Sequence, residues 1–299
     1  MKYKNLVFFV MLSIAWGTAF NAIKVGLNSF PPVLFAGIRY SLAGAIMLSY
    51  AYLVTDRFFP KSKEEFLQVL VAGFFMIACY HSFLFVGELK VTSSVASIIV
   101  SLSPVLTTGT SKIILPEEKI DLNLIIGLLL GLIGVIILFN PGTLNILKFD
   151  FYRFLIFLAA FSFAIGSTLT RFIDTDMPPE SLEAWAMVTG TLFMLITSQV
   201  FLEESLILDL NVISVGSLVY LSIISSAFGF LLYFNLLREL GPIEVNLVSY
   251  SAPIFATLLG IFLLKETLSL NTIIAFLFIF IGFISLKKDS IRREISKWR

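Results

Sequence analysis

The sequence contains only one cysteine and one histidine, Cys79 and His81. A single cysteine excludes a disulfide within the chain. The two side chains cannot form a four-ligand metal site unless other donors join them. The sequence therefore predicts neither a metal site nor any other cofactor.

Charged residues are also scarce, and their signs nearly cancel. They make up 14% of the chain, and 21 Lys and Arg against 20 Asp and Glu leave a net charge of +1. Such a balance gives no overall field that would attract nucleic acid, so we predict no nucleic-acid partner. A G-x-x-x-x-G-K-[ST] phosphate loop is absent as well, since "GTSK" at residues 109–112 lacks the leading glycine. This absence excludes an ATP-driven pump that acts alone.

Hydrophobic residues are what the chain has in excess, at 58% of all residues. Soluble domains are only about half apolar and about a quarter charged. Apolar runs long enough for a helix to cross a bilayer, about 17 to 25 residues, occur at 6–27, 33–54, 66–87, 92–113, 122–140, 152–172, 181–201, 212–236, 243–264 and 270–286. The sequence thus predicts an all-α integral membrane protein with ten transmembrane helices and the lipid bilayer as its surroundings.

Lys and Arg are distributed unequally between the two sides of a ten-helix chain. Fifteen fall on the side of the termini and four on the other side, while Lys24 and Arg39 lie inside runs. Cytoplasmic segments of membrane proteins are enriched in Lys and Arg. Both termini are therefore predicted to be cytoplasmic, which requires an even number of crossings.

The chain also repeats itself at an offset of about 149 residues. The members of the first half that match are Ser97, Ser101, Pro104, Thr108 and Ser111, which align with Asn246, Tyr250, Pro253, Thr257 and Gly260. We predict a first repeat at residues 1–140, a linker at 141–150, a second repeat at 151–287 and a basic cytoplasmic tail at 288–299. With five helices each, the two repeats would be inverted relative to each other, a construction typical of transporters that work by alternating access.

Pro104 and Pro253 lie at matching positions of this repeat, each on a stripe of small and polar residues. A proline inside a helix leaves a backbone carbonyl without its usual partner, here that of Val100 or Ser249. In a membrane that carbonyl needs a neighbouring helix or a hydrated cavity. The two prolines are predicted hinges or cavity walls, and close helix packing is the alternative.

Residues 16–48, "WGTAFNAIKVGLNSFPPVLFAGIRYSLAGAIML", resemble the EamA-type domain of the drug/metabolite transporter superfamily. The resemblance continues through "LSP" at 102–104 and "PEEKIDLNLIIGLLLGLIGVIIL", and it recurs in "SAPIFATLLGIFLLKETLSLNTIIAFLFIFIG". The second half departs from the pattern at 164–170, where "AIGSTLT" has no Trp, and at Ala186, near the expected Arg. The resemblance implies ten helices as two inverted five-helix repeats around a central pocket. It also implies transport of small metabolites, often amino acids and frequently outward.

Ionisable residues inside apolar runs are functional candidates by default, because they are costly there. Lys24, Arg39 and Glu88 fall at one depth and predict an intramembrane charge cluster in which Glu88 pairs with Lys24 or Arg39. The alternative is a structural clamp or snorkelling to the interface. No acidic residue lies near the centre of a run. His81, with an unperturbed pKa near 6.5, is left as a candidate for proton coupling, or as a buried neutral histidine.

Aromatic and polar residues of the runs supply the candidate substrate pocket. Its predicted members are Trp16, Phe20, Asn21, Tyr80, His81, Ser101, Tyr233, Asn246 and Tyr250. No catalytic residue is predicted, because no second histidine or nucleophile elbow supports one.

Together these features predict a secondary transporter in the cell membrane. By its resemblance to the EamA-type domain, it would move a small metabolite, an amino acid or related solute, outward by alternating access, and a homodimer is left open. An integral membrane enzyme that uses His81, a channel and a lipid translocator are the alternatives.

Overall fold

The computed structural model describes residues 3–115, 122–139, 150–200, 210–241 and 245–297, and this part of the chain is helical without a strand. Seven helical stretches in it are long and apolar enough to cross a membrane: Tyr3–Gly26, Pro32–Val54, Lys63–Glu88, Ser93–Ile114, Phe151–Ile173, Pro179–Val200 and Val212–Leu240. Three shorter apolar helices are Ile125–Leu138, Val248–Leu264 and Leu270–Ser285. The prediction of an all-α membrane chain is confirmed.

Several of these stretches consist of more than one element. The elements are α1 Tyr3–Gly26, α2 Pro32–Val54, α3 Lys63–Val71, η1 Ala72–Cys79, α4 Tyr80–Glu88, α5 Ser93–Val100, α6 Ser103–Ile114, α7 Leu122–Phe139, α8 Phe151–Ile173, α9 Pro179–Val200, α10 Val212–Val219, η3 Tyr220–Phe228, α11 Gly229–Leu240, α13 Val248–Leu264 and α14 Leu270–Lys297. The segments η1 and η3 are π-helical. Such wider turns are rare and occur frequently at functional sites.

Local sequence signals explain where helices begin. Pro32 occupies the first turn of α2, where proline costs no hydrogen bond. The side chain of Thr92 caps α5, and Asn211 forms a reciprocal capping box with Ser214 at the start of α10. The Asp150 carboxylate accepts from the Arg153 amide at 3.1 Å at the start of α8. Apart from Asp150, the predicted linker lies outside the described residues.

The two repeated prolines sit in different local structures. The helix is interrupted between α5 and α6, and Pro104 lies in the first turn of α6. Near this break, the Ser103 hydroxyl donates to the Val100 carbonyl at 2.7 Å. Pro253, by contrast, lies inside the continuous helix α13. The expected freed carbonyl of Val100 therefore has a side-chain donor.

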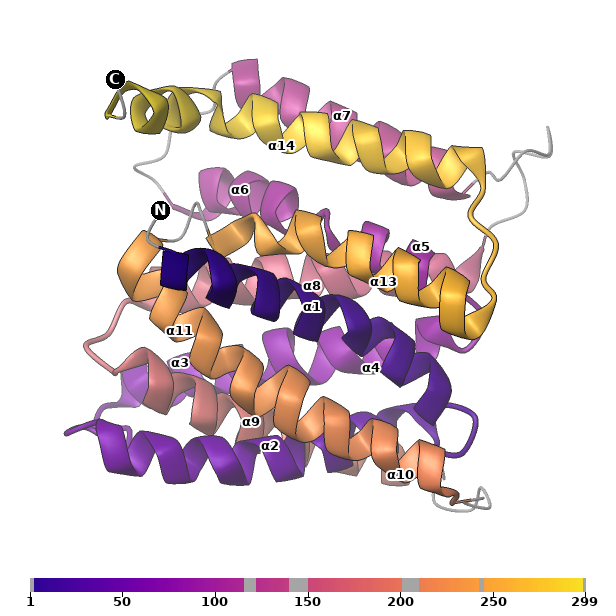
Figure 1. Ribbon diagram of the computed structural model, residues 1–299. Coiled ribbons are helices and arrows are strands. Elements are labelled where there is room, and N and C mark those ends of the chain that lie inside the picture. Colours follow the sequence, from indigo (N-terminus) through magenta and orange to yellow (C-terminus); the bar gives the residue numbers. More distant parts are fainter. Residues whose placement is uncertain (1–2, 116–121, 140–149, 201–209, 242–244, 298–299) are drawn as a thin grey trace.

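Small residues let the helices approach closely. Helix α7 packs along α14 on one side of the bundle, α2 packs along α9, and α1 packs against α13 (Figure 1). A Cβ atom added at Gly134 would lie 2.7 Å from the Ala275 carbonyl oxygen, and one at Gly282 would lie 2.7 Å from that of Gly127. Only glycine fits these two positions, because real Cβ atoms do not approach so closely.

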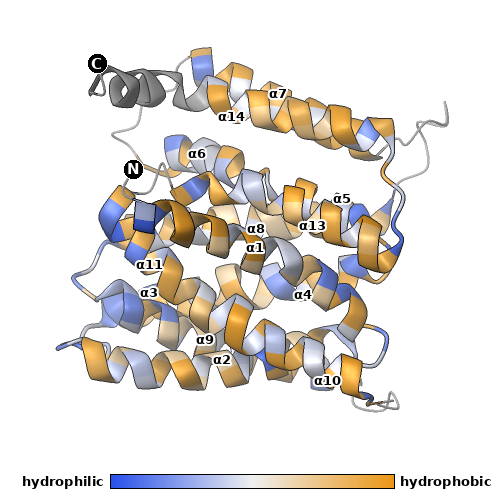
Figure 2. Cartoon of the chain, viewed as in Figure 1, coloured by the Kyte–Doolittle hydropathy of each residue, from blue (hydrophilic) through white to orange (hydrophobic). Residues whose placement is uncertain are grey.

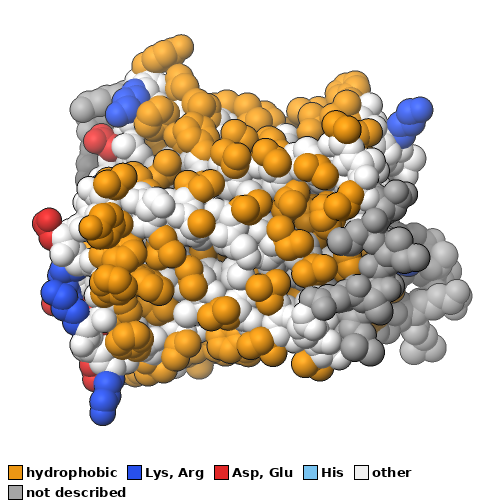
Figure 3. Space-filling model, turned by 90° about the horizontal axis from the view of Figure 1, so that it is seen from below, with side chains coloured by type: hydrophobic (Ala, Val, Ile, Leu, Met, Phe, Trp, Pro, Cys, Tyr) orange, Lys and Arg blue, Asp and Glu red, His pale blue; other side chains and the backbone are white. Residues whose placement is uncertain are grey.

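The outer surface is suited to a lipid environment. Hydrophobic residues run along the helices, and hydrophilic ones gather mainly toward the helix ends (Figure 2). Seen from the α2 side, the face is covered by hydrophobic side chains, while Lys, Arg, Asp and Glu lie at its ends (Figure 3). Helix α1 begins and α14 ends at the same end of the bundle (Figure 1).

Candidate functional site

Arg39, on α2, is the centre of a buried polar network. It is 5% exposed, its Nε donates to the Ser226 hydroxyl at 2.9 Å, and Nη2 donates to the Ser225 hydroxyl at 3.4 Å. Its guanidinium lies 5.0 Å from the centre of the Tyr40 ring. The charge is thus held by neutral hydroxyls and an aromatic face, in a geometry that Arg tolerates better than Lys does.

His81, on α4, is joined to this centre through Tyr40. The Tyr40 hydroxyl lies 2.7 Å from Nε2 of His81, and Nδ1 lies 2.9 Å from the Ile77 carbonyl oxygen. A carbonyl can only accept, so the neutral imidazole carries its proton on Nδ1 and accepts from Tyr40 at Nε2. The Tyr80 ring packs edge-on against His81, with centroids 4.5 Å apart.

Trp16, on α1, contacts the same centre through Ser225 of η3. Its Nε1 donates to the Ser225 carbonyl oxygen at 3.2 Å. Its ring stacks on Tyr233 with centroids 5.6 Å apart, and Phe230 lies edge-on at 5.9 Å. Because Ser225 contacts both Trp16 and Arg39, the aromatic cluster and the charged centre form one site.

The two π-helical segments contribute to both sides of this site. Ser225 and Ser226 belong to η3, and Ile77 belongs to η1. The sequence analysis did not identify these two serines. The available signal was the run "SIISSAF", in which hydroxyl side chains interrupt an apolar span. Ser222, Ser225 and Ser226 are all at most 1% exposed.

Glu183, on α9, is another ionisable residue in the same bundle. It is half-buried and acts electrostatically on the hydroxyl groups of Tyr40 and Tyr233. Glu183 thus lies within electrostatic reach of two tyrosines of the site, and no described hydrogen bond or ion pair joins it to Arg39.

Lys24 and Glu88 lie together near one end of the molecule, but they do not form the predicted side-chain pair. The Lys24 ammonium donates to the backbone carbonyls of Glu88 at 2.6 Å and Val91 at 2.9 Å. Arg39 donates to the two serines instead of Glu88. The ammonium stabilises the carbonyl end of α4, a favourable place for a cation. We call this the Lys24 end.

The remaining predicted pocket residues are dispersed. Asn21 donates to the Ser93 hydroxyl at 2.7 Å near the Lys24 end, and Phe20 belongs to the apolar core. The Ser101 hydroxyl donates to the Ile98 carbonyl in its own helix. Tyr250 packs against Phe283 and Phe280 of α14, with centroids 4.4 and 5.7 Å away.

Asn246 is half-buried before α13. Among the described contacts, those of Ser101 and Tyr250 do not reach the Arg39 network.

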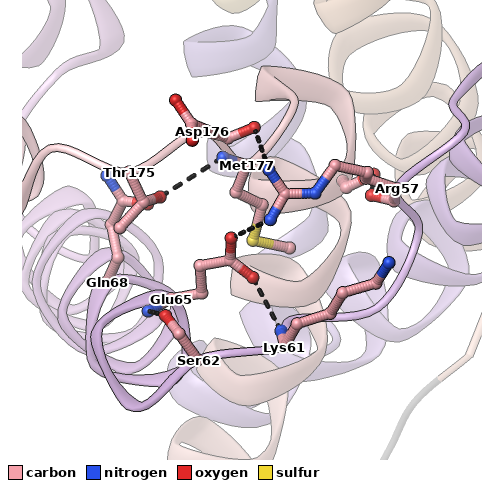
Figure 4. Close-up of polar contacts among 9 residues, drawn as sticks. Arg57, Lys61, Ser62, Glu65, Gln68, Thr175, Asp176 and Met177 are labelled. Carbon is pink, nitrogen blue, oxygen red and sulfur yellow. Dashed lines mark hydrogen bonds and ion pairs between the residues drawn. The ribbon is translucent and has the colours of Figure 1, made fainter.

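A second polar cluster lies at the opposite end of the bundle, where α2 ends and α3 begins (Figure 1), and Figure 4 shows its polar contacts. Arg57 is paired with Glu65 and donates from Nη1 to the Asp176 carbonyl oxygen at 3.1 Å. Gln68 donates to the Thr170 carbonyl at 2.8 Å and accepts from the Thr175 hydroxyl at 2.5 Å. We call this the Arg57 end. Its bonds join the segment after α2 to the segment between α8 and α9.

The family comparison gives one model that matches nearly the whole chain. The EamA-like transporter family matches residues 4–140 and 151–286.

Relatives with similar sequences carry transporter names. An "Uncharacterized transporter" of Archaeoglobus fulgidus is 30% identical over 264 residues, 86% of this chain and 89% of the relative. YoaV of Bacillus subtilis, also named an uncharacterized transporter, is 25% identical over 93% of this chain and 95% of its own. The "Uncharacterized inner membrane transporter YedA" of Escherichia coli is 27% identical over 86% of this chain and 82% of its own.

One solved crystal structure has the same fold. It superposes with a TM-score of 0.65 at 21% identity, and the match covers 98% of this chain and 100% of the other.

Proposed function

This chain belongs to the EamA-like transporter family, and from that membership we propose that it is a secondary carrier that moves a small metabolite across the cell membrane by alternating access. It is a multi-pass membrane transporter and not an enzyme, as the family and the transporter names of its relatives show. We further propose its mechanism as a carrier, the class of its solute, the direction of transport and the position of the substrate site.

The proposed architecture is ten helices in two inverted repeats. The three shorter apolar helices add to the seven longer ones. The two matched segments, 4–140 and 151–286, support repeats at 1–140 and 151–287 with a tail at 288–299. The π-helical segments also occupy corresponding positions, Ala72–Cys79 and Tyr220–Phe228, about one repeat apart. The predicted cytoplasmic position of both termini belongs to the same proposal, and the homodimer stays a prediction.

Alternating access is supported by the two polar clusters at opposite ends. At the Lys24 end, Lys24 joins α1 to the end of α4, and Ser93 of α5 joins Asn21 of α1 to Glu266 in the segment after α13. At the Arg57 end, Arg57 and Gln68 join the first half to the second. A carrier must break each set of contacts in turn while the other holds.

The substrate site proposed here is the Arg39 network with Trp16, Tyr233, Tyr80 and His81. The observation that carries it is a buried guanidinium that hydrogen-bonds neutral serines. Such a cation is suited to bind a carboxylate, and the Trp16 and Tyr233 rings are suited to pack against an apolar part of a solute. A solute that carries a carboxylate, such as an amino acid, fits these chemistries, with export as the proposed direction.

Counterflow in proteoliposomes tests this function without a gradient. Vesicles are loaded with an unlabelled amino acid, and uptake of the same labelled solute is followed across a panel of amino acids and related metabolites. A carrier produces transient accumulation with at least one of them. Uptake that never exceeds equilibration, despite rapid flux, would identify a channel instead.

A further inference from the structure

Glu88, the last residue of α4, is a fully buried carboxyl group. It is 0% exposed, and neither of its carboxylate oxygens has a hydrogen-bond partner among the described residues. Its neighbour Gly87 packs so closely on α8 that an added Cβ would lie 2.4 Å from the Ile156 side chain. The 0% exposure of Glu88 means that its carboxyl group does not contact bulk solvent in this form.

The cation nearest to Glu88 is already occupied. The Lys24 ammonium donates to the carbonyl oxygens of Glu88, Val91 and, at 3.4 Å, Leu89. The ammonium therefore donates its N–H groups to backbone carbonyls at and after the end of α4, and none to the Glu88 carboxylate. Lys24 thus acts on the Glu88 side chain through its charge alone.

The other carboxylate at this end is fully satisfied. Glu266 accepts from the amide and hydroxyl groups of Ser93, at 2.8 and 2.9 Å, and from those of Ser94, at 3.2 and 2.7 Å. It caps the start of α5 and balances the charge of Lys24. An ionised Glu88 would add a second negative charge that has no donor.

Few other charged groups face Glu88. Arg39 of α2 interacts with Glu88 electrostatically, but its hydrogen bonds go to serines. Tyr80 of α4 lies within electrostatic reach of both Glu88 and Arg39. On α8, the neighbour of α4, Arg153 is paired with Asp150 at 3.1 Å. No partner in the described part of the chain stabilises the ionised form, and a buried unpaired charge is strongly unfavourable.

We propose that Glu88 is a proton-binding site that couples opening of the Lys24 end to proton release. In the closed form the carboxyl group holds a proton. When the end opens, its O–H bond breaks, the proton passes to water on that side, and the electron pair stays on the carboxylate. The Lys24 ammonium then moves from the carbonyl oxygens to this carboxylate, which releases the end of α4.

The site is linked to the substrate centre along α4. Tyr80, His81 and Glu88 lie on the same helix, and Tyr80 is within electrostatic reach of Arg39 and Glu88. A charge that appears at Glu88 is therefore sensed at the centre. This inference rests on the proposed carrier function, but its test needs no solute.

Infrared titration of the full chain in nanodiscs tests the proton directly. The wild-type minus Glu88→Gln difference spectrum should contain a protonated-carboxyl band near neutral pH, because any contribution from Glu183, another carboxyl group within the bundle, is equal in both spectra and cancels. Glu64→Gln, the same change at an exposed residue of α3, should keep the band. An identical band in wild type and Glu88→Gln would overturn the proposal. If Glu88→Gln fails to fold, Glu88→Asp must shift the titration midpoint, and an unshifted midpoint overturns it equally.

Cysteine labelling tests the opening. In a Cys79→Ala background, Val91→Cys reports on a position that is 4% exposed, and Lys90→Cys, at an exposed neighbour, corrects for thiol ionisation. The corrected rate should rise at least about threefold from mildly acidic to mildly alkaline pH. It should stay flat in Glu88→Gln, and a rise that persists there overturns the coupling. If the wild-type chain shows no counterflow of any solute but gives the expected infrared band and labelling rates, the carrier function is wrong and the proton site stands.

Discussion

The hydroxyl of Tyr40 on α2 lies 2.7 Å from Nε2 of His81 on α4, and both residues are at most 6% exposed. This bond gives the imidazole two partners, one on each nitrogen. It favours the structural interpretation of His81 over a proton-carrying one, because a satisfied buried imidazole resists a change of charge.

Substitution of His81 separates the two interpretations. His81→Gln should lower stability, by about 1–3 kcal/mol for a lost buried hydrogen bond, and leave the shape of the pH profile of counterflow unchanged. Tyr40→Phe, which removes only the hydroxyl, should lower stability through the same bond. Thermal melting and a pH series measure the two effects, and a flattened profile with normal stability would contradict this expectation.

Arg39 should be required for transport but not for folding. Arg39→Lys cannot reproduce the forked contact with Ser225 and Ser226, so counterflow should fall by at least about tenfold. Arg238→Lys is the matched control, because Arg238 is 63% exposed and pairs with Glu180 at 3.3 Å, away from the centre. Equal loss in both variants would indicate a general effect of removing an arginine.

The two prolines should differ when each is changed to alanine. Pro253→Ala restores a backbone donor inside α13 and should straighten it, so turnover should slow. Pro104→Ala changes a first-turn position of α6, where proline is tolerated, and should have the smaller effect on turnover. Turnover in proteoliposomes at matched protein density checks the order, and wild-type rates in both variants would leave the prolines without a hinge role.

Contact between α7 and α14 should depend on glycine. Gly282→Ala places a methyl group 2.7 Å from the Gly127 carbonyl oxygen, and we expect a loss of about 1–3 kcal/mol. Gly216→Ala is the control, since a Cβ there meets nothing within 4 Å. Thermal unfolding of both variants in the same detergent gives the comparison, and equal melting temperatures would show that the helices can move apart without cost.

Both termini should report a cytoplasmic location. The Lys and Arg bias of the sequence predicts it, and α1 begins at the end of the bundle where α14 ends (Figure 1). Reporter fusions that are active only on one side of the membrane measure it at each terminus. A signal from the outer side at either terminus would contradict the ten-helix arrangement.

Much of the helical layout follows from the sequence, because a helix in lipid satisfies its own backbone and needs only a long apolar run. The run at 33–54 and the helix Pro32–Val54 differ by one residue at the start. The predicted end of the last run, 286, falls short of α14, which continues to Lys297. The length of an apolar run predicts which residues lie in lipid. It does not predict where the helix ends, because a helix can continue beyond the lipid into water.

The candidate site could be foreseen only in part. Trp16, Tyr233, Tyr80 and His81 stood out as aromatic or ionisable groups in apolar runs, and the structure connects all four to Arg39 through described contacts. Tyr250 stood out equally, yet it packs against α14. The sequence alone does not show which helices, far apart in the chain, pack against the face of a helix that carries a given side chain.

The sequence by itself determined the membrane class, the apolar runs, the family and the residues whose charge is costly in lipid. Only the tertiary structure decided their partners. Arg39 binds Ser225 and Ser226, more than 180 residues away, and Lys24 binds backbone carbonyls and leaves the Glu88 carboxylate without a donor. The physical reason is that hydrogen bonds need contact within about 3 Å, and such contact depends on the depth and rotation of packed helices. The π-helical turns at η1 and η3 alter both, and apolar periodicity does not encode them.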